Sequence, residues 1–337
     1  MQIILLLLLA WTSAVKVIHH HELLLEEWNA FKLQYNKTFI HRDKDRVAMK
    51  IFARNKYKIA LHNQRYERGL EPFRMGINRF SDMTLKQFSR AMNGYRRTRD
   101  EDIKPATYIY AANVMASRSV DWVKEGAVTE VKDQTLRALE GQNFRKDKRL
   151  VSLSEQNLID CTQDSIADGC RGGNVVESFA YVSYNSGIDT EETYPYEAAI
   201  KKCRLFNNQR TPVIIVVRYN DTNSGAADVG FAEIEEGNEA DLEMAVATIG
   251  PVAVVIDGDH TSFMQYESGV FYEKRCSSIY VNHAMLVVGY GWDDRSGAYW
   301  LVKNSYGTGW GEDGYIRMAR YRRNNCGIAT EASFPLV

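Results

Sequence analysis

The sequence is poor in proline and has almost no net charge. Only 6 prolines and 23 glycines occur in 337 residues, which excludes collagen-like and low-complexity chains. The net charge of −1 argues against a nucleic-acid binder. Hydrophobic residues make up 45% and charged residues 25%, so the chain can bury a core, and its length suits two or three domains.

Long apolar runs are absent beyond the N-terminus, where a membrane-spanning helix would need ~18 such residues. The one apolar run, Ile3 to Ala10, is followed by small residues and is typical of a secretory signal peptide, residues 1–14. A membrane anchor is the alternative, but the run is too short to span a bilayer. We therefore expect the secretory pathway, with a lysosomal or extracellular destination. The glycosylation sequons at Asn36 and Asn220 fit that route.

The small net charge is the sum of two opposed parts. Residues 15–116 hold 20 Lys and Arg against 11 Asp and Glu, whereas residues 117–337 hold 22 against 32. Two parts of opposite charge attract each other, and protonation of carboxylates at acidic pH would weaken that attraction. The alternative interpretation is two unrelated solvated surfaces.

The N-terminal third has helical periodicity with one short strand. Apolar and aromatic stripes predict helices over residues 22–35, 43–68 and 84–92, and alternation predicts a strand over 73–80. The polar residues 100–117 have no sustained apolar period and are interpreted as a linker.

Motifs in this third resemble the ERFNIN and GNFD signatures of papain-family propeptides. The matching positions are Phe52, Asn55, Ile59, Asn63, Gly76, Asn78, Phe80 and Asp82. Lys44 and Ala48 depart from the pattern, which has Glu and Arg there. The resemblance implies a helical inhibitory prodomain of the I29 type at 15–99, with the linker at 100–117 cut on maturation.

The chain from Ser119 onward resembles cathepsin L-type cysteine peptidases, with family motifs in family order. They include Ser119–Trp122, Ser152–Cys161, Tyr194–Glu197, His283–Gly291 and Tyr299–Ser305. The resemblance implies a papain-like peptidase domain at 118–337, with a helical left domain and an antiparallel β-barrel right domain. The residues also favour an α+β class, because a capping box at Ser152 opens a helix and β-rich runs follow later.

The resemblance implies a set of catalytic residues. His283 is the expected base, Asn304 orients it, and Gln134 contributes to the oxyanion hole. Trp310 matches the residue that shields the His–Asn bond, and Tyr306 replaces the usual Trp beside it. The other histidine of this part, His260, is expected in a surface turn without a role.

The nucleophile of this chemistry is missing from the sequence. After Gln134 the family continues with a segment containing Cys-Gly-Ser-Cys-Trp, whereas this chain reads Thr135-Leu136-Arg137 and then Ala138. About ten residues are absent relative to the family pattern, nearly three helical turns at ~1.5 Å per residue. Without a thiolate the chain as written is expected to be inactive.

The cysteine count is five, and an odd number leaves at least one unpaired. By resemblance Cys161 pairs with Cys203 and Cys276 with Cys326. The partner of Cys170 lies in the absent segment, which makes Cys170 an orphan thiol. It lies among glycines away from the base, so a role as substitute nucleophile is not favoured.

The resemblance also implies a peptide-binding cleft, with an aliphatic or aromatic preference in its main subsite. The expected substrate-binding residues are Gly172, Gly173, Val175, Val281, Asn282, Ala284 and Trp310. Asn174, Val176 and Asn282 depart from the family pattern.

Two functions from different classes remain open. The chain is a cysteine endopeptidase zymogen that has lost a segment through splicing or gene modelling, or it is a catalytically inactive homologue that binds peptides or inhibits related enzymes. A structural or storage role has no positive feature. We expect no cofactor, no metal, a monomer, and as partners only peptides or proteins and its own prodomain, with no nucleic acid and no membrane.

Overall fold

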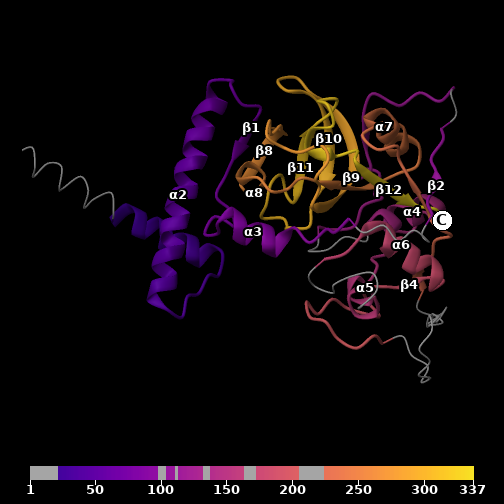
Figure 1. Cartoon of the computed structure of the whole chain (residues 1–337), viewed down its shortest axis with the longest axis horizontal. Coiled ribbons are helices and arrows are strands. Elements are labelled where there is room, and N and C mark those ends of the chain that lie inside the picture. The colour runs from indigo at the N-terminus through magenta and orange to yellow at the C-terminus, as the bar shows by residue number, and fades with distance from the viewer. Residues whose placement is uncertain (1–21, 98–103, 111–112, 132–136, 163–171, 205–223) are drawn as a thin grey trace, which may run out of the picture.

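The computed structural model describes residues 22–97, 104–110, 113–131, 137–162, 172–204 and 224–337 (Figure 1). The expected signal peptide lies outside the described residues. Among the residues that are described, no helix combines the length and hydropathy that crossing a bilayer requires.

The N-terminal region, residues 22–97, begins with two helices that pack through the predicted aromatic stripe. Residues 22–34 are helical and are followed by α2 (Arg42–Glu67). Trp28, Phe31 and Phe52 form a buried cluster, in which the rings of Phe31 and Phe52 lie 4.8 Å apart. Ala48, where the family pattern has Arg, belongs to the same cluster, so apolar packing replaces an ion pair there.

Two asparagines of α2 hold the chain that follows the helix. Asn55 Nδ2 donates to two backbone carbonyls within residues 81–83, each at 2.9 Å. Asn63 exchanges two hydrogen bonds with the backbone of Met75. Both motif asparagines are thus partners of the backbone, and at Asn63 the side chain must be an amide, because it both donates and accepts.

The strand predicted after α2 is shorter than expected. β1 spans only Phe73–Met75, because the side chain of Asn78 accepts a hydrogen bond from the Phe80 N–H and turns the chain. α3 (Leu85–Met92) follows and begins with the predicted capping box at Thr84. Turn formation by a side chain therefore overrides the alternating pattern.

A helical lobe opens the C-terminal region, residues 118–337. It contains α4 (Arg137–Asp147), α5 (Glu155–Cys161), α6 (Val175–Tyr184) and a small sheet of β4 (Ile188–Asp189) and β5 (Ser224–Ala226).

The capping box predicted at Ser152 is wrong. Ser154 caps α5 instead, accepting from the Asn157 N–H, because the chain at Leu153 is extended in a bridge with Thr190.

The second lobe is built on a ten-stranded sheet (Figure 1). Its C-terminal strands are β3 (Val120–Asp121), β6 (Phe231–Glu233), β7 (Val252–Ile256), β8 (Tyr266–Phe271), β9 (His283–Asp293), β10 (Gly297–Lys303), β11 (Tyr315–Ala319) and β12 (Glu331–Pro335). The elements between them are α7 (Glu239–Thr248), α8 (Thr261–Met264) and the 3-10 helix η3 (Asn325–Gly327). The strand order is β1-β8-β11-β10-β9-β7-β12-β6-β2, where β2 spans Ala106–Thr107, and β3 pairs with β9. The predicted α+β class is confirmed.

Both ends of this sheet are formed by strands that precede the C-terminal region. β1 pairs antiparallel with β8 at one end, and β2 (Ala106–Thr107) pairs parallel with β6 at the other. The large buried side chains Trp300, Trp310 and Tyr266 belong to the main core of this lobe, which Phe73 and Phe88 of the N-terminal region join.

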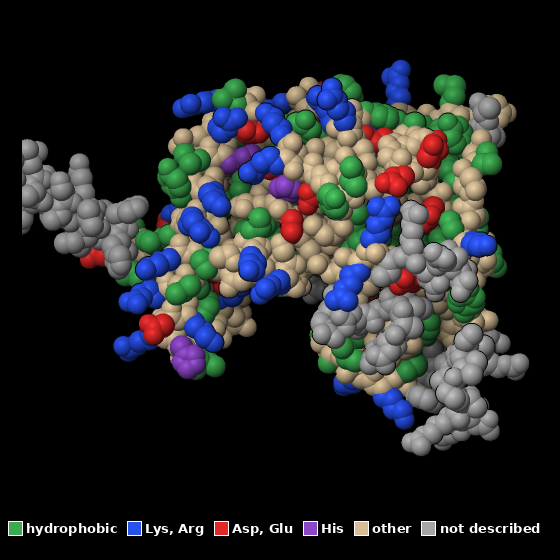
Figure 2. Space-filling view, in the orientation of Figure 1, with side chains coloured by type: hydrophobic (Ala, Val, Ile, Leu, Met, Phe, Trp, Pro, Cys, Tyr) green, Lys and Arg blue, Asp and Glu red, His purple; other side chains and the backbone are tan. Residues whose placement is uncertain are grey.

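Charges of the expected sign meet where the two regions are in contact. Figure 2 shows many Lys and Arg side chains on the side of the molecule where α2 lies. Arg74 pairs with Glu267 at 3.3 Å, and Arg97 pairs with Glu331 at 2.8 Å and with Glu236 at 3.4 Å. The opposed charges of the two parts are therefore in direct contact at these points.

Candidate active site

His283 and Asn304 lie together at the ends of two paired strands. His283 is the first residue of β9, and Asn304 follows the last residue of β10, the antiparallel neighbour of β9. The imidazole Nε2 lies 2.8 Å from the side-chain oxygen of Asn304, and neither residue is more than 4% exposed. Because that oxygen accepts, Nε2 carries the hydrogen, and Nδ1 is left as the nitrogen that can receive a proton.

The Nδ1 side of His283 is covered by Tyr306. The two rings are stacked, with centroids 4.8 Å apart and an interplanar angle of 29°. The Tyr306 hydroxyl lies 3.4 Å from Nδ1 and donates to the side-chain oxygen of Asn93 at 3.3 Å. The sequence assigned the shielding ring to Trp310. The structure stacks Tyr306 there, and Trp310, itself fully buried, packs edge-on against Tyr306.

The N-terminal region seals the imidazole from water. Burial lowers the pKa of His283 to about 4, and hydrogen bonds with Asn304 and the Met92 backbone offset part of this effect. Met92 is the last residue of α3, so this helix brings the chain directly to the imidazole. In this form the base is neutral at any pH well above 4.

Residues 93–97, which follow α3, run between the two lobes. The Tyr95 N–H donates to the carbonyl of Asn282 at 3.2 Å, and the Arg96 N–H donates to the carbonyl of Gly173 at 3.3 Å. Gly172 has φ +117°, and a Cβ there would lie only 1.8 Å from the Gly94 carbonyl oxygen. Glycine is therefore required at this close approach of two backbones.

We call the residues of the C-terminal region that contact segment 93–97 the interlobe site. The structure brings the predicted Gly172, Gly173 and Asn282 together in it. The side chain of Asn282 accepts from the Gly258 N–H at 2.9 Å and donates to Asp257 at 3.5 Å. An amide can make both bonds, whereas the aspartate of the family pattern could make only the first.

The predicted apolar residues of the subsite are only partly buried. Val175 begins α6, Ala284 is the second residue of β9, and Val281 precedes that strand by two residues. Their side chains are half-buried, which leaves apolar surface beside the interlobe site.

Sequence reasoning missed two residues of the interlobe site. Asn174 caps α6, accepting from the Val176 N–H at 2.9 Å, and its amide donates to the Arg96 carbonyl at 3.3 Å. Asparagine before an apolar helix is a capping signal that could have found it. Glu331, the first residue of β12, accepts from the Tyr95 hydroxyl. No local pattern marks that glutamate.

The two predicted disulfides are confirmed. Cys161 is bonded to Cys203, and Cys276 is bonded to Cys326. Every described cysteine is therefore in a disulfide, and none offers a thiol to His283.

Three predicted residues lie outside the described residues: the expected oxyanion residue Gln134, the expected orphan Cys170 and the sequon residue Asn220. The other sequon residue, Asn36, is described and exposed.

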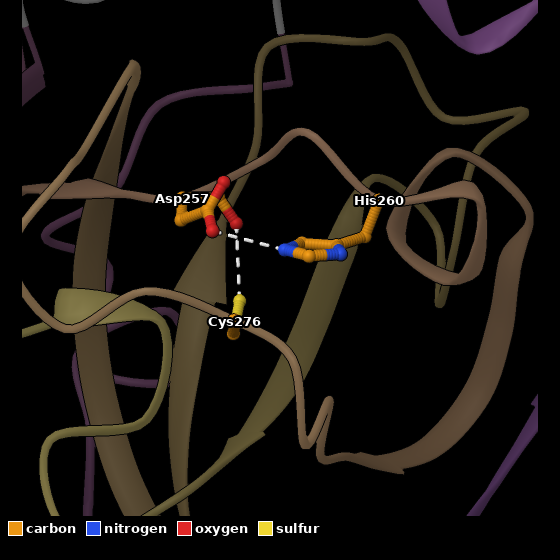
Figure 3. Close-up of side chains that lie close together, drawn as sticks. All are labelled: Asp257, His260 and Cys276. Atoms are coloured by element: carbon orange, nitrogen blue, oxygen red, sulfur yellow. Dashed lines mark hydrogen bonds and ion pairs between the residues drawn. The ribbon is translucent and has the colours of Figure 1, made fainter.

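His260 is paired with Asp257 beside Cys276, mostly buried, which corrects its prediction as a plain surface turn (Figure 3). Its Nε2 lies 2.9 Å from an Asp257 carboxylate oxygen, and both side chains are at least 86% buried. The Cys276 sulfur lies 3.3 Å from the Asp257 backbone oxygen, but it belongs to a disulfide. Without a thiolate the three residues are not a metal-ligand set.

Comparison with known families accounts for most of the chain. Residues 116–336 match the papain family cysteine protease, and residues 28–88 match the cathepsin propeptide inhibitor domain I29. The N-terminal region that covers His283 thus resembles an inhibitory propeptide both in sequence and in its position.

Individual relatives give the same result. The chain is 44% identical over 351 residues to a cathepsin L-like peptidase of Aedes aegypti, covering 99% of both, and 44% identical over 353 residues to cathepsin L of Sarcophaga peregrina, covering 100% of both. The solved structure of digestive procathepsin L 3 from Tenebrio molitor larval midgut matches with a TM-score of 0.81 and 37% identity, covering 94% of this chain and 99% of that one. The chain belongs to the papain family of cysteine proteases and has the propeptide-plus-protease organisation of a cathepsin L-type zymogen.

Proposed function

We propose that this chain is a cathepsin L-type cysteine endopeptidase zymogen by family, which is inactive as its sequence stands because it lacks the nucleophile. The observation that carries the proposal is the surroundings of His283. Its Nε2 is held by Asn304, but Tyr306 lies at Nδ1, where a thiol would have to give up its proton. All described cysteines are in disulfides.

The sequence leaves no room for the nucleophile before the helix that should present it. The described part of α4 starts at Arg137, three residues after the expected oxyanion residue Gln134 in the sequence. A family nucleophile acquires its low pKa at the N-terminus of this helix, so loss of the first turns removes both thiol and activating dipole. The Sarcophaga relative aligns over 353 positions against 337 residues here, so it has residues without a counterpart in this chain.

The remaining residues would support thiol chemistry if a longer form restored the segment. A neutral imidazole with its Nε2–H bonded to Asn304 keeps Nδ1 as its basic nitrogen, which a thiol could use as a general base if it replaced the Tyr306 hydroxyl there. Gln134 would donate to the developing oxyanion, and the backbone of Gly173 would bind the substrate as it now binds Arg96.

An insertion experiment tests this proposal. The full chain and a variant in which Thr135-Leu136-Arg137 is replaced by the family segment with Cys-Gly-Ser-Cys-Trp are assayed with a fluorogenic peptidyl substrate at acidic pH. We expect no turnover by the chain as written and turnover by the variant that a thiol-directed epoxide blocks. Turnover by the chain as written, blocked by the same epoxide, would overturn the proposal. Sequencing transcripts across these codons shows whether a longer form exists.

The second candidate function is peptide binding without cleavage. The backbone hydrogen bonds of Tyr95 and Arg96 favour it, because any extended peptide offers the same groups. Asn174 and Asn282 depart from the family pattern, but the side chains of both form hydrogen bonds in the interlobe site. If every form of the protein detected in tissue lacks the nucleophile segment, this function is favoured.

We also propose entry into the secretory pathway through the signal peptide 1–14, with maturation between Ala112 and Arg118 in the linker. The two disulfides support an oxidising compartment. N-terminal sequencing of protein recovered from lysosomes and from culture medium tests both cleavages and the destination. A chain that still begins at Met1 in both fractions would rule out the signal peptide.

A further inference from the structure

The segment that lies between the lobes begins with an asparagine followed by glycine. Asn93-Gly94 is the only such pair in the sequence, and it comes directly after α3. Asparagine is a chemically labile residue, and it loses its side-chain amide most readily before glycine, because glycine has no side chain to hinder attack by its backbone nitrogen. Segment 93–97 therefore starts at a position that can change its own covalent structure.

This deamidation needs only water. The Gly94 nitrogen attacks the side-chain carbon Cγ of Asn93, a C–N bond forms, and Nδ2 leaves as ammonia with the proton that the Gly94 nitrogen gives up. Water then adds to one of the two carbonyl carbons of the resulting five-membered imide and breaks its bond to the nitrogen. Breaking the bond at Cγ gives aspartate. Breaking the bond at the backbone carbon gives isoaspartate, in which the main chain runs through the former side chain.

The structure keeps the two reacting atoms apart while segment 93–97 is seated in the interlobe site, an arrangement we call the closed form. Ring closure requires the Gly94 nitrogen to lie on the same side of the bond between Cα and the carbonyl carbon as Cβ of Asn93. The ψ angle of Asn93 is 84°, which places that nitrogen on the opposite side. The side chain is also held at both ends, because Nδ2 donates to Asp259 at 2.9 Å and Oδ1 accepts from the Tyr306 hydroxyl at 3.3 Å. Asn93 is therefore protected in the closed form.

The products of deamidation do not fit the contacts that Asn93 makes. In aspartate, the oxygen that replaces Nδ2 would face the Asp259 carboxylate, and two carboxylates at this distance repel each other. Ser89 of α3 also donates to Asp259, so that carboxylate is held at its place. Isoaspartate would lengthen the main chain by one atom before Tyr95 and Arg96, whose N–H groups are bonded to the two lobes. Either product disfavours the closed form.

We propose that Asn93-Gly94 is a one-way latch on the interlobe site, operated by spontaneous deamidation. In the closed form the pair does not react, and when the segment opens the pair becomes part of a flexible peptide that does. Deamidation then keeps the segment from closing again, so a transient opening becomes permanent. The latch needs no thiol, and it would act in a peptidase zymogen and in a peptide-binding homologue alike.

Peptide mapping by mass spectrometry tests the protection of Asn93. The full chain is kept at pH 8, and aspartate and isoaspartate at position 93 are quantified over time, with the free peptide Ala-Met-Asn-Gly-Tyr-Arg as reference. We expect the chain to react at least about tenfold more slowly than the peptide, since only the open fraction reacts. Tyr306→Phe should raise the rate about fivefold, because one anchor of the side chain is lost.

A backbone variant tests the same point independently of the side-chain anchors. Gly172→Ala places a Cβ against the Gly94 carbonyl oxygen and should displace the segment. Its rate should come within about threefold of the free peptide's rate. Gly230→Ala is the matched control, because Gly230 is another glycine with positive φ but has open space around it. That variant should stay within about threefold of the parent.

Hydrogen exchange of the Tyr95 and Arg96 amides in the full chain tests whether the segment fails to close again. Asn93→Ala should speed this exchange about fivefold, and Asn93→Asp at least about threefold more, because repulsion adds to the lost bond. The double variant Asn93→Asp with Asp259→Asn restores a pair of one carboxylate and one amide with their positions exchanged. Its exchange should return to within about threefold of the parent.

Two kinds of result would overturn the latch. Deamidation of the parent as fast as the free peptide, or of Gly172→Ala as slowly as the parent, would show that closure does not protect Asn93. Exchange in Asn93→Asp as slow as in the parent would show that the deamidated segment still closes. Should Gly172→Ala fail to fold, Tyr306→Phe decides, because an unchanged deamidation rate in that variant would refute the protection.

Discussion

The hydroxyl of Tyr306 lies 3.4 Å from Nδ1 of His283, the nitrogen that the family's thiol would use. The same hydroxyl donates to Asn93, the first residue after α3. One side chain therefore connects the candidate base to the N-terminal region. A tryptophan, which the family has here, carries no hydroxyl and could not make this pair of contacts.

Replacing Tyr306 with Phe should loosen segment 93–97 without disturbing the ring stack on His283. A neutral hydrogen bond contributes about 1 kcal/mol, so the amides of Tyr95 and Arg96 should exchange about fivefold faster with solvent. Hydrogen exchange followed by mass spectrometry measures this on the full chain. Asn93→Ala should act similarly, and the double variant should add little. Full additivity of the two effects would show that the Tyr306–Asn93 bond does not act as one unit.

Replacing Gly172 with Ala should separate the N-terminal segment from the helical lobe. Its Cβ would lie 1.8 Å from the Gly94 carbonyl oxygen, closer than any real contact. Gly230→Ala is the matched control, since Gly230 also has positive φ, +134°, but no atom lies within 4 Å of its added Cβ. Both variants carry backbone strain, so only Gly172→Ala should abolish the exchange protection of Arg96. Equal protection in the two variants would contradict the close approach.

Acid should weaken the closed form through His283. The folded-state pKa of about 4 lies below the ordinary value of 6.5, so the stabilisation is present above pH 6.5 and is lost as pH falls through 4. The shift corresponds to stability on the order of 3 kcal/mol. Denaturant unfolding of the full chain between pH 7 and 4 measures it, and His283→Gln should flatten that part of the profile. An unchanged slope in His283→Gln would assign the acid sensitivity to other groups.

Alkaline pH should weaken the protein through Asp228. Burial raises its pKa to about 7 from 3.8, although the Gly230 N–H and Ser183 favour the charged form. Its stabilisation is therefore complete below 3.8 and is lost as pH rises through 7. Asp228→Asn should be more stable than the parent at pH 9, by up to about 4 kcal/mol, and should lose that advantage at pH 4. The exposed Asp294→Asn is the control, and the same pH-dependent gain in that variant would refute the assignment.

The sequence alone predicted those site residues that lie within family motifs. His283 and Asn304 lie in long family motifs, and the structure places them 2.8 Å apart. The two disulfides, the α+β class and the helices of the N-terminal region could be predicted for the same reason. α2 spans 42–67 where 43–68 was expected.

Contacts between distant segments could not be predicted in this way. Nothing near Glu331 in the sequence indicates that Tyr95, more than 200 positions earlier, lies against it. The stacking of Tyr306 on His283, instead of Trp310, depends on how the loop after β10 folds back on the sheet. The capping residue of α5 was misplaced by two positions because pairing of Leu153 with Thr190 keeps the chain extended up to Ser154.

The strands β1 and β2 occupy opposite ends of the main sheet, and both precede the C-terminal region. Cutting the chain in the linker and losing what precedes it would uncover the hydrogen-bonding edges of β8 and β6 at the same time. Exposed strand edges are templates for pairing with other chains. The chain that precedes the C-terminal region therefore affects solubility as well as access to His283. A form that has lost both β1 and β2 would have two new sites for self-association, one at each end of the sheet.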